Sequence, residues 1–292
     1  MNKYNYIINP IKLDDIVQYD KSKFNSNNHW VGDERPLDYD KILSHTNTSK
    51  WISLFRPNYI EIKIINPTWI GWLKKAYEIG CQTGKFTELY RDEIDAISSE
   101  LDKLYPKIFS DKGYFVRVNN VSLKYGQHKE GPYYSFKQIL ESITSCISGH
   151  TPIYLDTTEL IIYLIDWIEI KPKDEFRVFV FENKITAISQ QNLYSRLFSE
   201  DKNNSNFELE LKKKLDIIVN YFYSTMINSI NWISSYTFDF AIVDLKPYLI
   251  ELNSFGKEYA AGSALFHWIL DELILYNKFE NDNLSIEFRY TV

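Results

Sequence analysis

The chain has 292 residues, of which 45% are apolar, and a formal charge of −6 at pH 7, so it can bury a sizeable core as one large or two smaller domains. The mild acidity argues against broad, nonspecific binding to nucleic acid, no apolar run is long enough to span a bilayer, and 2 cysteines are too few for a disulfide framework or a zinc site. Because the chain starts without a secretory apolar region, we expect a cytoplasmic protein, although an effector secreted without a standard signal would have the same composition.

The predicted elements alternate between helices and strands along the chain. The first 58 residues are polar and irregular in pattern. Apolar periodicity and capping residues then predict a strand at 60–65, a helix capped by Thr68, a helix at 94–104, a strand at 114–121, a loop at 125–134 and a helix capped by Ser135. Further on we expect strands at 159–168, 175–182 and 184–190, a polar loop at 200–206, an amphipathic helix at 207–229, a hairpin at 236–256, a helix near 262–276 and a last strand at 284–291. Interspersed helices and adjacent antiparallel hairpins predict an α+β fold with two lobes.

The segment Gly80–Lys85 looks like a phosphate-binding Walker A loop but departs from it in three ways. Its glycines stand one residue too close together, Phe86 replaces the Ser or Thr that binds magnesium, and the segment follows a predicted helix where the motif follows a strand. We interpret it as a helix C-terminus capped by Gly80 or Gly84.

The hairpin at 236–256 carries the strongest functional signal. Its apolar strands flank a turn at 244–247, so Asp239 falls opposite Glu251. Asn253 shares the face of Glu251, because side chains two apart on a strand point the same way. Two carboxylates and an amide oxygen suit a hard cation such as Mg²⁺, which completes its shell with water and phosphate oxygens. Acidic residues at strand ends are usually only solvated, but these two interrupt strongly apolar strands, which favours a metal platform for a nucleotide.

Positively charged side chains lie in two other predicted strands. Arg117 and Arg177 each stand in an apolar, alternating strand, where a cation needs a protein carboxylate or a ligand phosphate as its partner. Asn119 shares the face of Arg117, Lys124 follows the same strand, and Gln190 adds an amide on the strand after Arg177. Together with the hairpin, these groups predict a charge-balanced pocket for a triphosphate with magnesium. The alternative is an internal salt-bridge network between the two arginines and the two acids.

The segment Trp167-Ile168-Glu169 ends a strongly apolar strand and leads into a short polar connection. Adenine can bind at such a place, with backbone groups contacting its edge. The alternative is that Trp167 fills the core.

Four motifs, in this order and spacing, resemble the cell-division-cycle protein 123 family. They are residues 174–180 (DEFRVFV), 188–190 (ISQ), 237–239 (TFD) and 249–256 (LIELNSFG). The resemblance covers residues 114–270, whereas the first 110 residues have no confident match. It implies an ATP-grasp fold, two-lobed and α+β with antiparallel sheets, which binds ATP and Mg²⁺ between its lobes. Eukaryotic members of that family are assembly chaperones for translation initiation factor 2 and bind its gamma subunit.

Residue by residue, the resemblance implies the following roles. Asp239, Glu251 and Asn253 would be metal ligands; Arg117, Lys124 and Arg177 would contact phosphate; Trp167, Ile168 and Glu169 would line the adenine pocket; and Asn119 and Gln190 would lie close to the nucleotide. The chain departs from the family where Arg117 replaces Lys, Glu251 replaces Asp and Gln191 replaces Arg. Nucleotide binding is compatible with these changes, whereas binding to the translation factor does not follow from them, because partner surfaces diverge faster than a nucleotide site.

These observations predict an N-terminal α/β region at 1–110, a first ATP-grasp lobe at 111–172 and a second lobe with the metal-binding hairpin at 173–292. The function they favour is a nucleotide-dependent assembly factor for a protein partner similar to the gamma subunit of translation initiation factor 2. The alternative is an ATP-dependent ligase that activates a carboxylate as an acyl phosphate for attack by an amine, which requires no nucleophilic side chain. A third possibility is a structural domain with a degenerate pocket.

Overall fold

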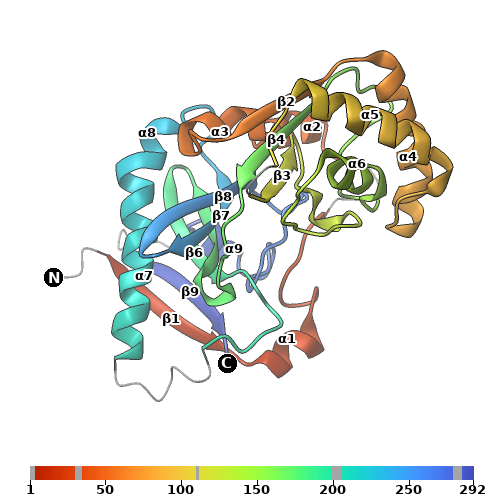
Figure 1. Cartoon of the computed structure of the whole chain (residues 1–292). Helices are drawn as coiled ribbons and strands as arrows, with labels where there is room; N and C mark the ends of the chain where they lie inside the picture. Colours follow the sequence, from red (N-terminus) through yellow and green to blue (C-terminus); the bar gives the residue numbers. More distant parts are fainter. Residues whose placement is uncertain (1–3, 30–34, 110–111, 199–205, 279–284) are drawn as a thin grey trace. The chain divides into compact units, whose positions relative to one another are not determined.

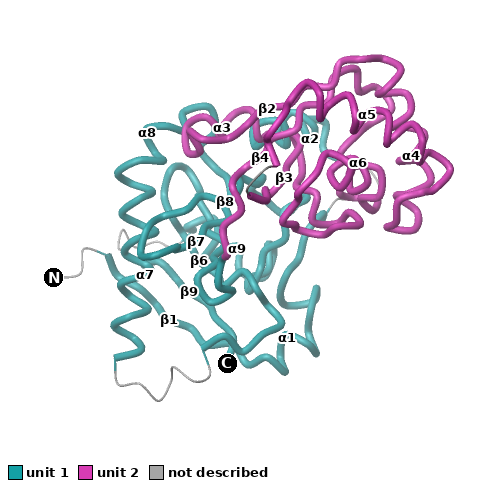
Figure 2. The backbone as a smooth tube through the Cα atoms, in the orientation of Figure 1, with its two compact units in different colours: residues 1–46, 170–292 teal, residues 47–169 magenta. Residues whose placement is uncertain are grey.

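The structure is a computed structural model that describes residues 4–29, 35–109, 112–198, 206–278 and 285–292. The chain forms two compact units (Figures 1 and 2): unit 1 comprises Met1–Thr46 and Ile170–Val292, and unit 2 comprises Asn47–Glu169. The boundary expected at residue 110 therefore falls inside unit 2, while the one expected at residue 172 lies near the end of that unit.

The helices are α1 (Leu13–Tyr19), α2 (Tyr39–Ser44), α3 (Thr48–Phe55), α4 (Pro67–Thr83), α5 (Arg91–Leu104), α6 (Phe136–Ser145), α7 (Phe207–Tyr221), α8 (Ile227–Ser229) and α9 (Glu272–Leu275). The strands are β1 (Asn5–Ile11), β2 (Ile60–Ile64), β3 (Tyr114–Val118), β4 (Leu160–Asp166), β5 (Glu175–Phe181), β6 (Lys184–Gln190), β7 (Tyr236–Val243), β8 (Lys246–Ser254) and β9 (Ser285–Thr291). A π-helical turn, Phe222–Met226, joins α7 to α8. No helix in the described ranges combines the length and apolar character needed to cross a membrane.

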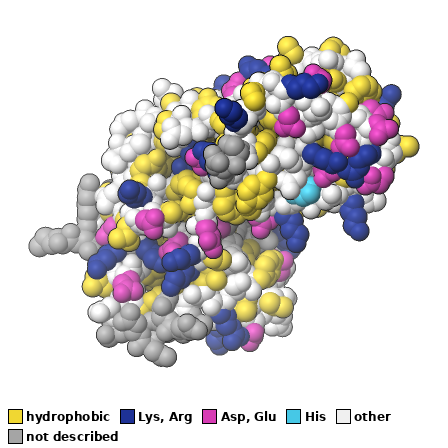
Figure 3. All heavy atoms as spheres, viewed as in Figure 1, with side chains coloured by type: hydrophobic (Ala, Val, Ile, Leu, Met, Phe, Trp, Pro, Cys, Tyr) yellow, Lys and Arg dark blue, Asp and Glu magenta, His cyan; other side chains and the backbone are white. Residues whose placement is uncertain are grey.

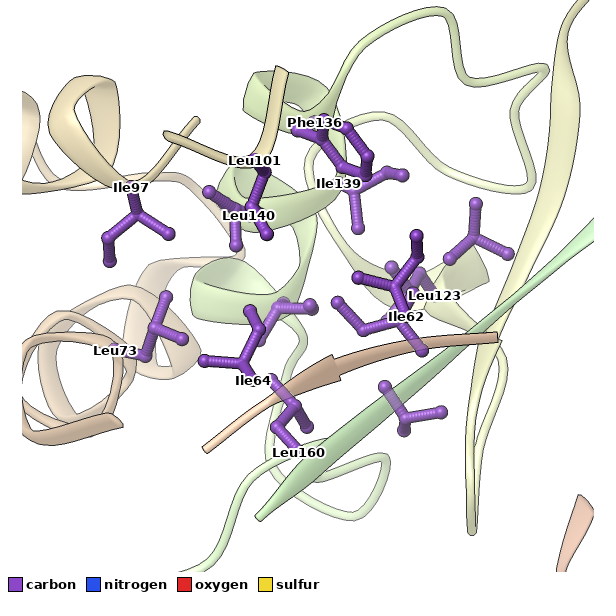
Figure 4. Close-up of a cluster of buried hydrophobic side chains, with 14 of the residues drawn as sticks. Ile62, Ile64, Leu73, Ile97, Leu101, Leu123, Phe136, Ile139, Leu140 and Leu160 are labelled. Carbon is purple, nitrogen blue, oxygen red and sulfur yellow. The ribbon is translucent and has the colours of Figure 1, made fainter. Parts of the chain in front are cut away.

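Unit 2 is built on a three-stranded antiparallel sheet in the order β2-β4-β3. Alternation in β2 buries Ile62 and Ile64 and leaves Glu61 and Lys63 at the surface. Figure 4 shows how side chains from the sheet and from α4, α5 and α6 meet in one core. Its labelled members are Ile62, Ile64, Leu73, Ile97, Leu101, Leu123, Phe136, Ile139, Leu140 and Leu160. The helix that Ser135 caps is confirmed, because the Ser135 hydroxyl accepts a hydrogen bond from the backbone N–H of Gln138.

Unit 1 is built on a six-stranded sheet in the order β1-β9-β6-β5-β7-β8. The strands from β6 to β8 pair antiparallel, as expected, whereas β9 pairs parallel with both β1 and β6. Helix α7 covers one face (Figure 1), and the Phe222 ring that follows it stacks on Phe238 with ring centres 6.2 Å apart. This contact places the apolar side of the amphipathic helix on the apolar side of the sheet.

The two faces of this sheet are separated by the register of its strands. One row of directly paired residues crosses all six strands and is apolar: Ile8, Phe288, Ile188, Val178, Phe238 and Leu252. The adjacent row is polar or charged: Asn9, Arg289, Ser189, Arg177, Asp239 and Glu251. Because successive side chains on a strand point to opposite faces, the sheet buries an apolar row under α7 and directs a charged row to its other side.

The hairpin of β7 and β8 is confirmed, with a tighter turn than expected. Its connection is the two residues Asp244 and Leu245, whose φ angles are 50° and 60°, as a two-residue hairpin turn of this hand requires. A register shift between Asp239 and Phe240 pairs Phe240 with Leu249. Asp239 nevertheless remains opposite Glu251, as predicted from the sequence.

Three expectations about secondary structure are wrong. The helix expected to be capped by Thr68 begins at Pro67, and its cap is Asn66, whose side-chain oxygen accepts the N–H groups of Thr68 and Trp69. The first 58 residues contain β1, α1, α2 and α3. The helix expected near 262–276 is limited to α9, because the preceding loop is held by distant backbone: the Asn25 N–H donates to Ala264 O at 2.8 Å, and the Ser263 N–H donates to Ser26 O at 3.1 Å. The polar loop expected at 200–206 lies outside the described residues except for Asn206, which precedes α7.

The surface that Figure 3 shows carries Lys and Arg side chains interspersed with Asp and Glu. The visible face therefore has no continuous stripe of one charge.

Three glycines of α4 and its end have different physical roles. Gly84 caps the helix with φ at 68°, and its N–H donates to Gly80 O, which confirms one of the two predicted caps. A Cβ on Gly80 would lie 2.0 Å from the Thr144 carbonyl oxygen of α6, whereas a Cβ on Gly71 would meet nothing within 4 Å. Gly80 therefore permits the close packing of α4 on α6, and Gly71 has no such role.

We expect Gly80→Ala and Gly71→Ala to change stability in opposite directions. Gly80→Ala should lower the free energy of unfolding by about 1–3 kcal/mol, because α6 must move away from α4. Gly71→Ala should raise it by about 0.5–1 kcal/mol, because alanine restricts the unfolded chain and favours helix. Denaturant titrations of both variants measure the two effects, and equal shifts would contradict the packing argument.

Buried His267 makes stability depend on pH. Its side chain is 6% exposed, and its Nδ1 accepts the backbone N–H groups of Ile269 and Leu270 at 3.2 Å each. Burial, with a smaller contribution from His29, lowers the pKa of His267 below its ordinary value. A proton on Nδ1 would also displace both hydrogen bonds.

The free energy of unfolding should therefore fall as the pH decreases below about 6.5, where the unfolded chain takes up a proton that the folded protein resists. Above that pH the imidazole is neutral in both the folded and the unfolded state, so it adds nothing to the pH dependence of the free energy of unfolding. In His267→Asn the amide oxygen can still accept the two N–H groups, so we expect this part of the slope to disappear. Denaturation midpoints of both proteins between about pH 8 and 5 provide the measurement, and an unchanged slope in the variant would assign it to other groups.

Candidate functional site

The residues predicted to bind metal lie together on the charged face of the β7–β8 hairpin. Asp239 pairs directly with Glu251, and Thr237 pairs with Asn253. The Asn253 Nδ2 lies 3.5 Å from Glu251 Oε1. Asp239 is 2% exposed, while Glu251 and Asn253 are half-buried. The hairpin therefore gathers two carboxylates and an amide into one patch, as its alternation predicts.

The neighbouring strand β5 adds an arginine to this patch. Arg177 pairs with Asp239 across β5 and β7, and two of its nitrogens bind the carboxylate: Nε lies 2.8 Å from Oδ1, and Nη2 lies 2.8 Å from Oδ2. The third nitrogen, Nη1, donates to Gly262 O at 2.6 Å. Gln191 donates from Nε2 to Asp239 Oδ2 at 3.1 Å. This fork-like pairing holds the carboxylate in a single orientation.

The salt-bridge alternative is thus present in part, as the pair of Arg177 and Asp239. Arg117 belongs to unit 2, where its Nε lies 3.3 Å from Thr48 Oγ1. Burial raises the pKa of Asp239 above its ordinary value, Arg177 opposes this shift, and Glu251 adds to it. The two carboxylates therefore repel each other, which a cation beside them would relieve.

The residues of this patch fit a magnesium ion. Their donor atoms are carboxylate and amide oxygens, which a hard cation prefers, and Asp239 retains acceptor capacity beside Arg177 because each carboxylate oxygen has two lone pairs. In addition, the buried Thr237 Oγ1 on the same face has no hydrogen-bond partner among the described residues. The described part of the chain contains no group of three or more His, Cys, Asp or Glu that could hold a metal, so a site here depends on oxygens from Asn253 and from the ligand.

The other predicted nucleotide contacts in unit 2 stay predictions. Asn119 accepts the Ser49 N–H on Oδ1 at 3.1 Å, so it lies with Arg117 near the start of α3. Lys124 is exposed, and its Nζ is 5.6 Å from the centre of the Tyr125 ring. Beyond β4, Trp167, Ile168 and Glu169 are exposed or half-buried. Trp167 is 36% exposed, so it does not fill the core, and its backbone N–H donates to Gly113 O at 3.2 Å.

Gln190 is in unit 1 but is engaged away from the hairpin. Its Nε2 donates to Thr291 Oγ1 at 2.8 Å and to Ser195 O at 3.2 Å, and its Oε1 accepts the Thr291 N–H at 3.1 Å. The amide therefore ties β6 to β9 and to the loop after β6. The predicted contact between Gln190 and the nucleotide stays a prediction.

A second buried ion cluster was not predicted from the sequence. Arg289 binds Asp271 through Nη1 and Nη2 at 2.9 and 2.7 Å, and binds Glu287 through Nε at 2.7 Å. The alternation of residues 286–290 (IEFRY) in the last predicted strand was the available signal, because it sets an acid and a base on one face. This cluster anchors the loop before α9 to the sheet.

We expect loss of the Asp239 carboxylate to lower the free energy of unfolding more than loss of the Asn253 amide does. Asp239→Ala leaves Arg177 buried without its partner and should lower the free energy of unfolding by about 3–5 kcal/mol. Asn253→Ala removes one weak contact and should cost less than about 1 kcal/mol. Denaturant titration of the two variants tests this difference, and similar small losses would show that Arg177 does not depend on Asp239.

The D123 family model matches residues 135–292. The translation initiation factor eIF2 assembly protein of Candida albicans is 30% identical over 133 residues, which cover 43% of this chain and 36% of that protein. The chain thus matches little more than a third of the length of its curated relative.

Two solved structures have a similar fold. They are Cdc123 from Schizosaccharomyces pombe and a C-terminally truncated form of it; each has a TM-score of 0.55 and 17% identity, and each comparison covers 86% of this chain and 98% of the other. At this identity the likeness concerns the fold alone, and it confirms the expected α+β class with a fold similar to that of Cdc123. Because the family model covers more than half of the residues, the chain belongs to the D123 family, the family of Cdc123.

Proposed function

We propose that the protein binds ATP with magnesium at the β7–β8 hairpin and that the nucleotide-bound form acts as an assembly factor for a translation-factor-like protein. The observation that supports the first part is the patch of Asp239, Glu251 and Asn253 on the charged face of a buried sheet. A divalent ion on this patch would neutralise phosphate charge, as in other proteins that bind nucleoside triphosphates.

The residues of the patch would have different roles in binding the ion. Glu251 and Asn253 are half-buried, so their oxygens can reach an ion that approaches from solvent. Asp239 is held by Arg177, which keeps its carboxylate in place when the ion is absent. Such preorganisation lowers the cost of binding, because the ligand does not have to order the side chain.

Support for a translation-factor partner comes from the relative in Candida albicans, whose name describes an eIF2 assembly protein. The match covers 43% of this chain and 36% of that relative. We propose the same class of partner, and the family resemblance narrows it to the gamma subunit of translation initiation factor 2. The ligase alternative involves the same hairpin and differs in whether ATP is consumed.

Binding of ATP should require magnesium and the two half-buried residues of the patch, Glu251 and Asn253. Glu251→Gln or Asn253→Ala should weaken Mg²⁺·ATP binding by roughly 10- to 100-fold, because each removes a contact to a charged ligand worth about 1.5–3 kcal/mol. Both variants retain the pair of Arg177 and Asp239, so the fold is preserved. Calorimetric titration with ATP, with and without Mg²⁺, is the measurement.

Asp244→Asn is the matched control, because it makes a carboxylate-to-amide change in the exposed turn of the same hairpin. Its binding should equal that of the unsubstituted protein. Absence of Mg²⁺-dependent ATP binding in the unsubstituted protein would overturn the proposal. Release of ADP on addition of a carboxylate and an amine would favour the ligase, whereas intact ATP with co-purification of the gamma subunit would favour the assembly factor.

A further inference from the structure

Thr237 has an unusual side chain for its position in unit 1. It is 0% exposed, and its Oγ1 lacks a hydrogen-bond partner within the described residues. Buried hydroxyl groups in folded proteins nearly always have a partner, because an unpaired one loses its hydration without compensation. The hydroxyl of Thr237 therefore requires an explanation.

Other buried hydroxyl groups of the same sheet are paired. Thr186 Oγ1 donates to Leu275 O at 3.0 Å. Ser189 Oγ donates to Gln190 O at 2.8 Å and accepts the Leu265 N–H at 3.1 Å. The unpaired state of Thr237 is thus not a general property of this sheet.

The position of Thr237 associates it with the proposed magnesium–nucleotide site. It precedes Asp239 by two residues on β7, so both side chains lie on the charged face. It pairs directly with Asn253 on β8, and its other neighbour in the row is Phe179 on β5. The Phe179 ring has no polar atom, so Asn253 is the polar one of the two cross-strand neighbours of Thr237, and it lies on the side of the patch.

The β-propensity of threonine does not account for this residue. Valine has nearly the same shape and the same preference for strands, and it would fill the position without an unpaired hydroxyl. A hydroxyl that is unpaired in the free protein is explained if its partner arrives with a ligand.

We propose that Thr237 is a positioning residue of the magnesium–nucleotide site, whose hydroxyl donates a hydrogen bond to an oxygen of the bound ligand. The acceptor is a phosphate oxygen or a water held by the ion, which share the same chemistry. This inference rests on the proposed binding of ATP with magnesium and adds to the patch a fourth residue, which the metal-ligand pattern does not include.

The test compares Thr237→Val with Thr237→Ser. Without ligand, Thr237→Val should raise the melting temperature by about 2–4 °C, because it removes the unpaired group and keeps the shape. The same variant should bind Mg²⁺·ATP roughly fivefold more weakly, as expected for the loss of one hydrogen bond. Thr237→Ser keeps the hydroxyl, so it should recover at least half of the Mg²⁺·ATP affinity that Thr237→Val loses. This combination of higher stability and weaker binding is not expected from a merely structural residue.

The control is Thr186→Val, which removes a buried hydroxyl that is paired in the same sheet. It should lower the melting temperature and leave Mg²⁺·ATP binding unchanged. Titration with Mn²⁺ alone identifies the acceptor: weaker Mn²⁺ binding in Thr237→Val indicates a metal-bound water, and unchanged Mn²⁺ binding with weaker Mg²⁺·ATP binding indicates a phosphate oxygen.

Two results would overturn the inference and leave the proposed function intact. One is Mg²⁺·ATP binding by Thr237→Val that equals that of the unsubstituted protein while Glu251→Gln binds weakly. The other is a lower melting temperature of Thr237→Val without ligand, because it would mean that the hydroxyl already has a partner. Failure of the unsubstituted protein to bind Mg²⁺·ATP would overturn both proposals, and it is recognised before any variant is made.

Discussion

The candidate site depends on the buried pair of Arg177 and Asp239 on adjacent strands β5 and β7. Neither charge can be buried alone at an acceptable cost in free energy, so each requires the other. Their two parallel contacts of 2.8 Å fix the carboxylate, and the third contact of Arg177 reaches the loop at Gly262. The pair thereby joins the hairpin, the centre of the sheet and the loop before α9.

Around this pair, the sheet of unit 1 is organised by strand register. An apolar row of six residues lies against α7, and the adjacent row on the opposite face carries the charges. The second ion cluster, Arg289 with Asp271 and Glu287, lies at the other end of this charged row. Both arginines also bind backbone carbonyls of the segment 262–265, so the charges on the sheet hold this loop in place.

The residues of the candidate site differ in how much the stability of the fold depends on them. Asp239 is required by Arg177 and thus by the core, whereas Glu251 and Asn253 are half-buried and the Thr237 hydroxyl has no partner in the described residues. Because Glu251 and Asn253 are only half-buried, a ligand can approach their oxygens while the pair of Arg177 and Asp239 stays intact. This division explains why variants at the edge of the patch report on binding more cleanly than variants at Asp239.

Local patterns in the sequence determined the hairpin, the pairing of Asp239 with Glu251 and the position of Asn253, because alternation and a short turn constrain residues close in the chain. Tertiary structure decided between the alternatives for Arg177, because its partner lies 62 residues away on a strand whose place beside β5 no local pattern specifies. The same holds for Gln190, which binds Thr291 across 101 residues, and for the loop near 262, which residues 25 and 26 hold out of a helix. Alternation depends only on residues close in the chain, so it can be read from the sequence. The pairing of strands far apart in the sequence is decided only when the whole chain packs.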